Sequence, residues 1–301
     1  MATKKKPTQF NTESFIKTFN SIALHKHRYE VFSDFIKMSA IALHNAIVKA
    51  EHLEKEYLEI VGKYKKEEVD QFPLLLANLI ELLEPEPIDI LGSLYMELEL
   101  SSNHTGQFFS PSPIAQLMAK IAHGGQLNML EEKAFITLSE PACGAGGMVL
   151  AFAKEMLHHG YNPAERLWVQ CVDIDRVAAM MCYVQLSLWN IPAQVIVGNS
   201  LTLEHREIFY TPAHYLFSWD QRLRARQVID LMRELETTTV EEAKAKEPET
   251  VAITATEAKP LQDVTVAEVK NQNTDKKPKK ETPKIGTQID LFSDFDFEID
   301  H

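Results

Sequence analysis

The stretch that decides the fold is Leu138-Ser-Glu-Pro-Ala-Cys-Gly-Ala-Gly-Gly147. An apolar run at 134–138 leads into it, and an amphipathic run at 148–157 follows it. This order predicts a buried strand, a tight glycine turn and a helix. Glycine permits positive φ and a close approach of the backbone to a ligand, and the start of a helix offers free N–H groups and a positive dipole end. We therefore expect this turn to hold a small, nucleotide-like molecule.

Two more apolar runs follow the glycine turn, at 167–172 and 193–197, with a helical pattern at 177–188 between them. Each apolar run ends in polar residues. Strands that alternate with helices predict a parallel α/β sheet joined by right-handed crossovers. Such a sheet binds its ligands at the carboxyl ends of the strands.

The polar residues at those strand ends have chemistry that suits a nucleoside. Asp173 ends the second strand and can accept hydrogen bonds from two ribose hydroxyls. Asn199 ends the third strand and can bond the amino edge of an adenine. Asp175 is better placed as the N-cap of the helix that follows.

Four segments, in this order, resemble the S-adenosylmethionine site of N6-adenine DNA methyltransferases. They are Thr105-Gly-Gln-Phe-Phe-Ser-Pro111, residues 140–147, residues 173–175 and Gly198-Asn-Ser-Leu201. The likeness is greatest to the modification subunit of type I restriction–modification systems, and it covers about residues 88–218, including the lead-in Asp89-Ile-Leu-Gly-Ser-Leu-Tyr95. A single glycine-rich loop would say little, but four ordered segments are specific. The resemblance implies a Rossmann-like domain that acts in DNA methylation.

The resemblance also implies S-adenosyl-L-methionine as the cofactor and a role for each matched position. The implied cofactor-binding residues are Thr105, Gly106, Phe108, Phe109, Glu140, Pro141, Cys143, Gly144, Gly146, Gly147, Asp173, Ile174 and Asn199. In this family Asp173 would hold the ribose and Ile174 would lie against the adenine. The family usually has aspartate where this chain has Asn199, which offers one acceptor oxygen and no charge, so weaker binding is expected. Taken alone, the adjacent phenylalanines 108 and 109 favour packing over ligand binding.

The catalytic step of the resembled family needs a fourth strand that ends in Asn-Pro-Pro-aromatic. This motif grips the amino group of an adenine flipped out of the duplex. At about that distance this chain has Thr211, Pro212, Ala213 and His214, which retain one proline only. The catalytic residues are therefore unknown, and little or no methyl transfer by the chain alone is expected.

Folded sequence is predicted to end near residue 236, where the family continues through three more strands. A short basic helix carries Arg222, Arg224 and Arg226, which could touch DNA phosphates or form a solvated face. The predicted organisation is a disordered segment at 1–9, a helical N-terminal domain at 10–87, an S-adenosylmethionine-binding domain at 88–236, a disordered linker at 237–287 and a tail at 288–301. Histidines in the helical region favour surface positions over a metal site, and no metal is expected.

The predicted tail alternates aromatic or aliphatic residues with acids, which is typical of a peptide ligand. Its segment Gln288-Ile-Asp-Leu-Phe292 resembles the pentapeptide by which bacterial replication proteins dock on the DNA sliding clamp. By that resemblance Gln288 would fill a polar pocket, and Leu291 and Phe292 an apolar one. The alternative is a tail that folds back on its own chain.

Bulk properties limit the function classes. The chain has 301 residues and a net charge of −12, which argues against a protein that simply coats nucleic acid. Three cysteines, no membrane-length apolar run and no signal peptide indicate a reduced, cytoplasmic protein without a membrane partner. Three hypotheses stay open: an adenine-specific DNA methyltransferase completed by a partner subunit, a non-catalytic binding subunit, and an adaptor for the sliding clamp.

Overall fold

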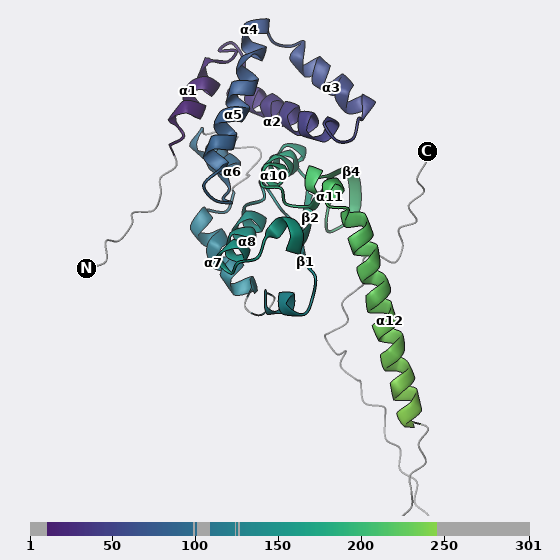
Figure 1. Cartoon of the computed structure of the whole chain (residues 1–301). Coiled ribbons are helices and arrows are strands. Elements are labelled where there is room, and N and C mark those ends of the chain that lie inside the picture. The colour runs from purple at the N-terminus through teal and green to yellow at the C-terminus, as the bar shows by residue number, and fades with distance from the viewer. Residues whose placement is uncertain (1–10, 99, 101–108, 124, 126, 246–301) are drawn as a thin grey trace, which may run out of the picture. The chain divides into compact units, whose positions relative to one another are not determined.

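The computed structural model describes residues 11–98, 100, 109–123, 125 and 127–245 (Figure 1). Described residues up to Ala245 belong to one compact unit. The predicted tail at 288–301, and the predicted linker beyond residue 245, lie outside the described residues. None of the described helices is long and apolar enough to cross a membrane.

The N-terminal part is helical, as its apolar spacing predicts. Its helices are α1 (Glu13–Ser21), α2 (Arg28–Asn45), α3 (Glu51–Val61), α4 (Lys66–Val69), α5 (Gln71–Leu83), α6 (Ile90–Glu97) and α7 (Ser112–His123). Aromatic rings from α1 and α2 interlock at their contact: the ring centroids of Phe15 and Phe35 lie 5.8 Å apart, and those of Phe19 and Phe32 lie 6.2 Å apart. Edge-to-face pairs of this kind are the preferred geometry of buried rings.

A four-stranded sheet follows, in the order β1 (Ile136–Glu140), β2 (Leu167–Asp173), β3 (Ala193–Asn199) and β4 (Glu204–Tyr210). The first three strands are parallel, which confirms the predicted α/β architecture, and their carboxyl ends meet at one edge. The remaining helical elements are η1 (Leu127–Glu131), α8 (Gly147–His158), α9 (Pro163–Arg166), α10 (Arg176–Leu188), α11 (Pro212–Leu216) and α12 (Trp219–Ala245).

β4 is a strand that the sequence pattern does not reveal. Only Phe209 of this strand is buried, so no apolar run marks it. β4 runs antiparallel to β3, with Asn199 opposite Glu204 and Tyr210 opposite Gln194. A β-bulge at Val197/Gly198 accompanies the pairing. The strand therefore depends on tertiary pairing with β3 more than on its own composition.

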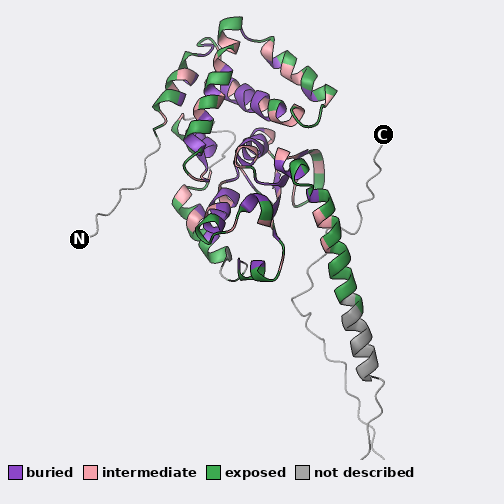
Figure 2. Ribbon diagram, viewed as in Figure 1, coloured by how far each residue is buried: buried purple, intermediate pink, exposed green. Residues whose placement is uncertain are grey.

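α10 is buried on nearly all sides, because it lies between the sheet and α2 (Figure 2). Its residues from Val177 to Leu186 are all buried. One hydrophobic core joins side chains of the N-terminal helices with side chains of the sheet. The N-terminal helices therefore cover the helix that positions the predicted cofactor loops.

α12 ends at Ala245, so residues 237–245 are helical where the sequence predicted a flexible linker. Its last five residues, at 241–245, are Glu, Glu, Ala, Lys and Ala, which are strong helix formers, whereas 237–240 are three threonines and a valine. The prediction failed there because Glu and Lys make a segment polar and also favour a helix, and because 237–240 continue a helix that begins at Trp219.

Candidate functional site

The glycine turn between β1 and α8 has a backbone that only glycine adopts without strain. Gly144 has φ +52° and Gly146 has φ +90°. The N–H of Gly146 donates to the carbonyl of Cys143 at 2.8 Å, and Gly146 is the N-cap of α8. A Cβ on Gly146 would lie 3.0 Å from Cys182 Sγ, and one on Gly144 would lie 3.1 Å from the ring of Phe109. The turn is therefore restricted by conformation and by space.

Asp173 is locked onto this turn. Its Oδ2 accepts from the N–H of Gly144 at 2.8 Å, and its Oδ1 accepts from the N–H of Asp175 at 2.8 Å. Burial raises the pKa of Asp173, while those two N–H groups oppose the rise. A carboxylate has about four acceptor sites, so about two stay free for ligand hydroxyls. The structure thus brings together Gly144 and Asp173, the two residues on which the predicted ribose site depends.

Ile174 and Asn199 flank the carboxylate at the same edge of the sheet. The Ile174 side chain is 64% exposed, which is unusual for isoleucine and leaves an apolar surface open. Asn199 Oδ1 accepts from the N–H of Leu201 at 3.0 Å, which orders the loop after β3. Its amide NH2 and one oxygen lone pair remain for a ligand. The roles of both residues in cofactor binding stay a prediction.

Arg176 supports the loop that carries Asp173. Its guanidinium binds both carboxylate oxygens of Glu56 from α3, at 2.7 and 2.8 Å, and both of Glu207 from β4, at 2.7 and 2.9 Å. Burial opposes the charge, but the hydrogen bonds to Glu56 and Glu207 raise the pKa of Arg176. Arg206 of β4 also donates to the carbonyl of Ile174. β4 therefore holds the loop, a contribution that the sequence did not show.

Gln185 and Asp89 form a buried polar hub beneath the turn. Gln185 Oε1 accepts from the N–H groups of Ile90 and Leu91 at 2.9 and 3.0 Å. Its Nε2 donates to Asp89 Oδ1 at 2.9 Å and to the carbonyl of Ala145 at 2.7 Å. Burial raises the pKa of Asp89. The signal that could have found this hub is one glutamine inside an otherwise apolar helix.

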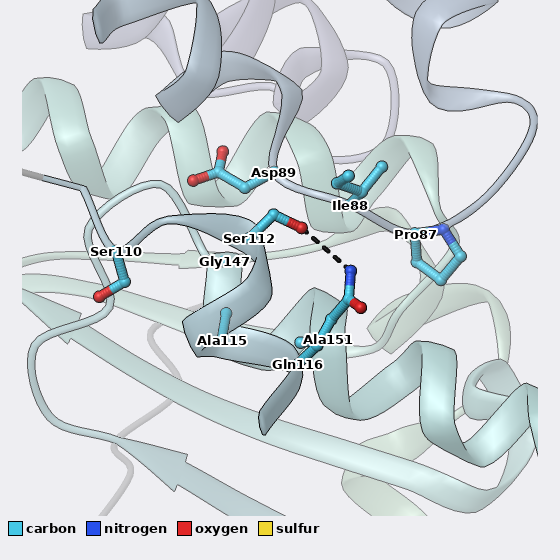
Figure 3. A pocket seen from close by; sticks show the side chains of 9 residues that line it. All are labelled: Pro87, Ile88, Asp89, Ser110, Ser112, Ala115, Gln116, Gly147 and Ala151. Atoms are coloured by element: carbon cyan, nitrogen blue, oxygen red, sulfur yellow. Dashed lines mark hydrogen bonds between the residues drawn. The ribbon is translucent and has the colours of Figure 1, made fainter. Parts of the chain in front are cut away.

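A small cavity lies behind the start of α8 (Figure 3). Its lining includes Asp89, Ser112, Gln116 and Gly147, and Gln116 Nε2 donates to Ser112 Oγ at 3.1 Å. Its volume of about 10 Å³ is room for one water molecule and far too small for a nucleoside. The cavity therefore belongs to the support of the turn and is not the cofactor site.

The other positions implied by the resemblance divide into two groups. Thr105, Gly106 and Phe108 lie outside the described residues. Phe109 is half-buried, and its ring meets that of Tyr95 edge-to-face with centroids 5.2 Å apart. Glu140 is half-buried at the end of β1, and burial raises its pKa. Phe109 thus packs, as its residue type favours, while also contacting the glycine turn.

The segment from Thr211 to His214 lies at the opposite edge of the sheet from the cofactor loops. Thr211 is fully buried, its hydroxyl donates to the carbonyl of Ile191 at 2.8 Å, and it accepts from the N–H of Ala193 at 2.9 Å. Ala193 begins β3, whereas Asn199 ends it. Because β4 is antiparallel, its last residue returns to the start of β3. The structure therefore does not bring this segment together with Gly144 and Asp173.

His214 makes hydrogen bonds through both nitrogens of its ring. Trp168 Nε1 donates to its Nδ1 at 3.2 Å, and its Nε2 lies 3.1 Å from Asp220 Oδ1. Burial lowers the pKa of His214, and Asp220 opposes that shift. These contacts require the neutral ring with its proton on Nε2. Both ring nitrogens are engaged, so the ring fastens the start of α12 to the sheet.

The arginines of α12 are partly committed to packing. Arg222 lies over the ring of Trp219, 3.8 Å from its centroid, and donates to the carbonyl of Glu165. Arg226 lies over the ring of Phe135 at 5.1 Å and donates to its carbonyl at 3.4 Å. Arg224 is exposed. Each of these two guanidinium groups lies against an aromatic ring and gives a donor to a backbone carbonyl, which favours packing for Arg222 and Arg226.

Comparisons with known proteins found one family model and one solved structure that are similar to this chain. Residues 87–224 match the family model described as N-6 DNA Methylase. A crystal structure from Listeria monocytogenes, described as a candidate class I S-adenosylmethionine-dependent methyltransferase, is similar at 15% identity and a TM-score of 0.34. The similarity covers 60% of this chain and 51% of that one, so it spans about half the length of that structure. No curated protein matches the chain. The match confirms the resemblance found in the sequence: the segment at 87–224 belongs to the N-6 DNA methylase family.

Proposed function

We propose that the chain is an S-adenosylmethionine-binding, N6-adenine DNA methyltransferase-like protein of restriction–modification type, which acts in the cytoplasm and transfers no methyl group by itself. The observation that carries the proposal is the contact between Asp173 and the N–H of Gly144. It joins an acidic strand end to a glycine turn with positive φ at the carboxyl edge of a parallel sheet. That combination suits a nucleoside with an anchored ribose.

The residues present fit such a cofactor. The free acceptor sites of Asp173 suit two ribose hydroxyls, and the exposed Ile174 offers an apolar face to an adenine. Asn199 presents both an amide donor and an acceptor to the adenine edge. When bound, the cofactor would supply an electrophilic methyl group at this edge of the sheet.

The geometry of the described residues argues against methyl transfer by this chain alone. Among them, no strand pairs with the outer side of β1, and no Asn-Pro-Pro-aromatic segment lies near Asp173. At the position in the chain where the motif is expected, Thr211, Ala213 and His214 are buried, and they lie near the amino ends of the parallel strands. We propose that a partner subunit supplies the grip on the target adenine and the principal contacts to DNA.

Isothermal calorimetry with S-adenosylmethionine tests the binding step. We expect one site per chain and at least about a tenfold loss of affinity in Asp173→Ala, because a charge-assisted hydrogen bond contributes about 1.5–3 kcal/mol. Absence of heat, or equal affinity in Asp173→Ala, would refute cofactor binding. Transfer of tritiated methyl groups to adenine in DNA by the purified chain would refute the second part of the proposal.

The sequence at the C-terminus supports a second candidate, an adaptor for the bacterial sliding clamp. Its basis is the segment Gln288-Ile-Asp-Leu-Phe292, which lies outside the described residues. A pull-down with purified clamp should succeed with the full chain and fail after Leu291→Ala with Phe292→Ala. Capture that is unchanged by this double substitution would remove the candidate. This adaptor role is compatible with cofactor binding.

A further inference from the structure

All three cysteines of the chain lie together beneath the glycine turn. Cys143 comes from the turn itself, Cys171 from β2 and Cys182 from α10. Their sulfur atoms all lie within 4.8 Å of one another, and each side chain is at most 6% exposed. Three separate elements thus bring the complete thiol content of the protein to one point.

We propose that Cys143, Cys171 and Cys182 form a buried binding site for one thiophilic divalent metal ion such as Zn²⁺. A zinc–sulfur bond is about 2.3 Å, so three thiolates around one ion lie about 4 Å apart. The observed limit of 4.8 Å exceeds this spacing by less than an ångström. Closing the site would therefore need the sulfur atoms to approach one another by less than an ångström.

The chemistry of the cluster selects the class of ion. Its members are all thiols, with no imidazole or carboxylate among them. Soft thiolate ligands favour zinc and other thiophilic ions over magnesium, calcium or manganese. A divalent ion with three thiolates carries one net negative charge, whereas a monovalent ion would leave two. Since charge is costly to bury, the divalent ion is favoured.

The surroundings lower the cost of that remaining charge. Gly146 is the N-cap of α8, a helix of 12 residues whose positive dipole end faces this side of the turn.

Such an ion would tie the turn to β2 and α10. Cys143 directly precedes Gly144, whose N–H binds Asp173, and the N–H of Cys143 donates to the carbonyl of Val172 at 2.9 Å. The ion would fix the cofactor turn by a second connection to the same strand. This inference does not depend on the proposed methyltransferase-like function, because the three thiols alone define the site.

Titration of the reduced full-length chain with Cd²⁺, followed by ultraviolet absorption, tests the proposal. Cd²⁺ bound to thiolates gives a charge-transfer band, and every thiol of the chain is in the cluster. We expect the band to saturate at one ion per chain, and equilibrium dialysis with Zn²⁺ to retain one ion. A wild-type protein that gives no thiolate band would overturn the proposal, whatever the variants do.

Two variants test the assignment to these residues. Cys182→Ala, and Cys171→Ala as a second choice if the first does not fold, should lower metal affinity by more than the about 10–100-fold that loss of an outer-shell partner costs. Circular dichroism of the metal-free variants controls for folding. A folded variant that keeps the band and the affinity of the wild type would also overturn the proposal.

Discussion

Tyr210, the last residue of β4, lies opposite Gln194 near the start of β3, and its hydroxyl accepts a hydrogen bond from Gln194 Nε2 at 2.7 Å. This pairing determines what the C-terminal end of β4 can reach. It carries Thr211 to the amino end of the parallel strands, while Asp173 and Asn199 lie at their carboxyl ends. The direction of one strand thus separates the cofactor loops from the segment that was expected at the catalytic position.

The two neighbouring aspartates provide a matched test of the site. Asp173→Asn should destabilise the fold by about 1–3 kcal/mol, because the new NH2 group would face an N–H donor, either of Gly144 or of Asp175. Asp175 instead caps α10 by accepting from the N–H of Ala178 at 2.8 Å. Asn caps helices as well as Asp does, so Asp175→Asn should change stability by less than about 0.5 kcal/mol.

Urea unfolding measures both aspartate variants, and calorimetry measures their cofactor affinity. We expect the affinity to fall in Asp173→Asn and to stay near the wild-type value in Asp175→Asn. Equal effects of the two substitutions on stability and affinity would contradict the assignment of the ribose site to Asp173.

Alanine substitutions at two glycines with positive φ distinguish the cost of backbone strain from the cost of steric crowding. Gly160 has φ +79° and open space where a Cβ would lie. Gly160→Ala should therefore lower the free energy of unfolding by about 1–2 kcal/mol, which is the cost of a left-handed backbone at a residue with a Cβ. Gly146 has φ +90°, and a Cβ there would lie 3.0 Å from Cys182 Sγ, so Gly146→Ala should cost about 1–3 kcal/mol more. Thermal unfolding of both variants measures the difference. Equal losses would mean that the cysteine yields without cost.

Arg176 should contribute to stability through a network and not through a single pair. Its side chain is 25% exposed, and the side chains of Glu56 and Glu207 are 29% and 33% exposed, so screening by solvent is partial. We expect Arg176→Ala to cost about 1–3 kcal/mol. Lys55→Ala, which removes an exposed pair to Glu59 at 4.0 Å, is the control and should change stability by less than about 0.5 kcal/mol.

Chemical denaturation measures both substitutions, and calorimetry follows cofactor affinity. Because Arg176 directly follows the predicted ribose-binding loop at 173–175, Arg176→Ala should also lower the affinity for the cofactor, whereas Lys55→Ala should not. If the Arg176→Ala and Lys55→Ala proteins were equally stable, water would stabilise the carboxylates of Glu56 and Glu207 as much as the arginine does, which would contradict the prediction.

His214 should make the fold sensitive to mild acid. Burial lowers the pKa of His214 in the folded protein, so the unfolded chain takes up the proton first. The stability from the neutral ring is fully present above the unfolded pKa of about 6.5 and is lost as pH falls through the folded pKa. Tyr210 and Tyr215, which contact the ring, have pKa values raised by burial and stay neutral in this range.

Melting temperatures between pH 5 and pH 8 test this dependence. His214→Gln keeps an acceptor for Trp168 and should flatten the acid side of the curve. Asp220→Asn removes the carboxylate that opposes the shift, so the pKa of His214 should fall further and the dependence should become steeper. A His214→Gln curve with the wild-type slope would assign the acid sensitivity to other groups.

Much of the candidate cofactor site could be predicted from short segments of the sequence. The glycine turn, the acidic end of β2 and the polar end of β3 are local patterns, because each lies within one strand and the loop after it. Their meeting at one edge follows from the rule for parallel sheets. The hydrogen bond between Gly144 and Asp173 confirms that these two segments come together.

The residues that hold the loops of this site in place could not be predicted from the sequence. Gln185 meets Asp89, Ile90 and Ala145, and Arg176 meets Glu56 and Glu207, across large separations along the chain. A glutamine in an apolar helix or an arginine in a first helical turn is compatible with many environments. The partner becomes known only when α10 is packed between α2 and the sheet.

The sequence by itself determined the α/β class, the glycine turn and the family of residues 87–224, because these depend on periodicity and on residue types within short segments. Only the tertiary structure decided the direction of β4, the far-edge position of His214 and the meeting of the three cysteines. Each of these depends on pairing or packing between segments whose own patterns leave several partners open. Local residue types therefore predict the cofactor-binding segments, and the direction of β4 decides which other residues lie near them.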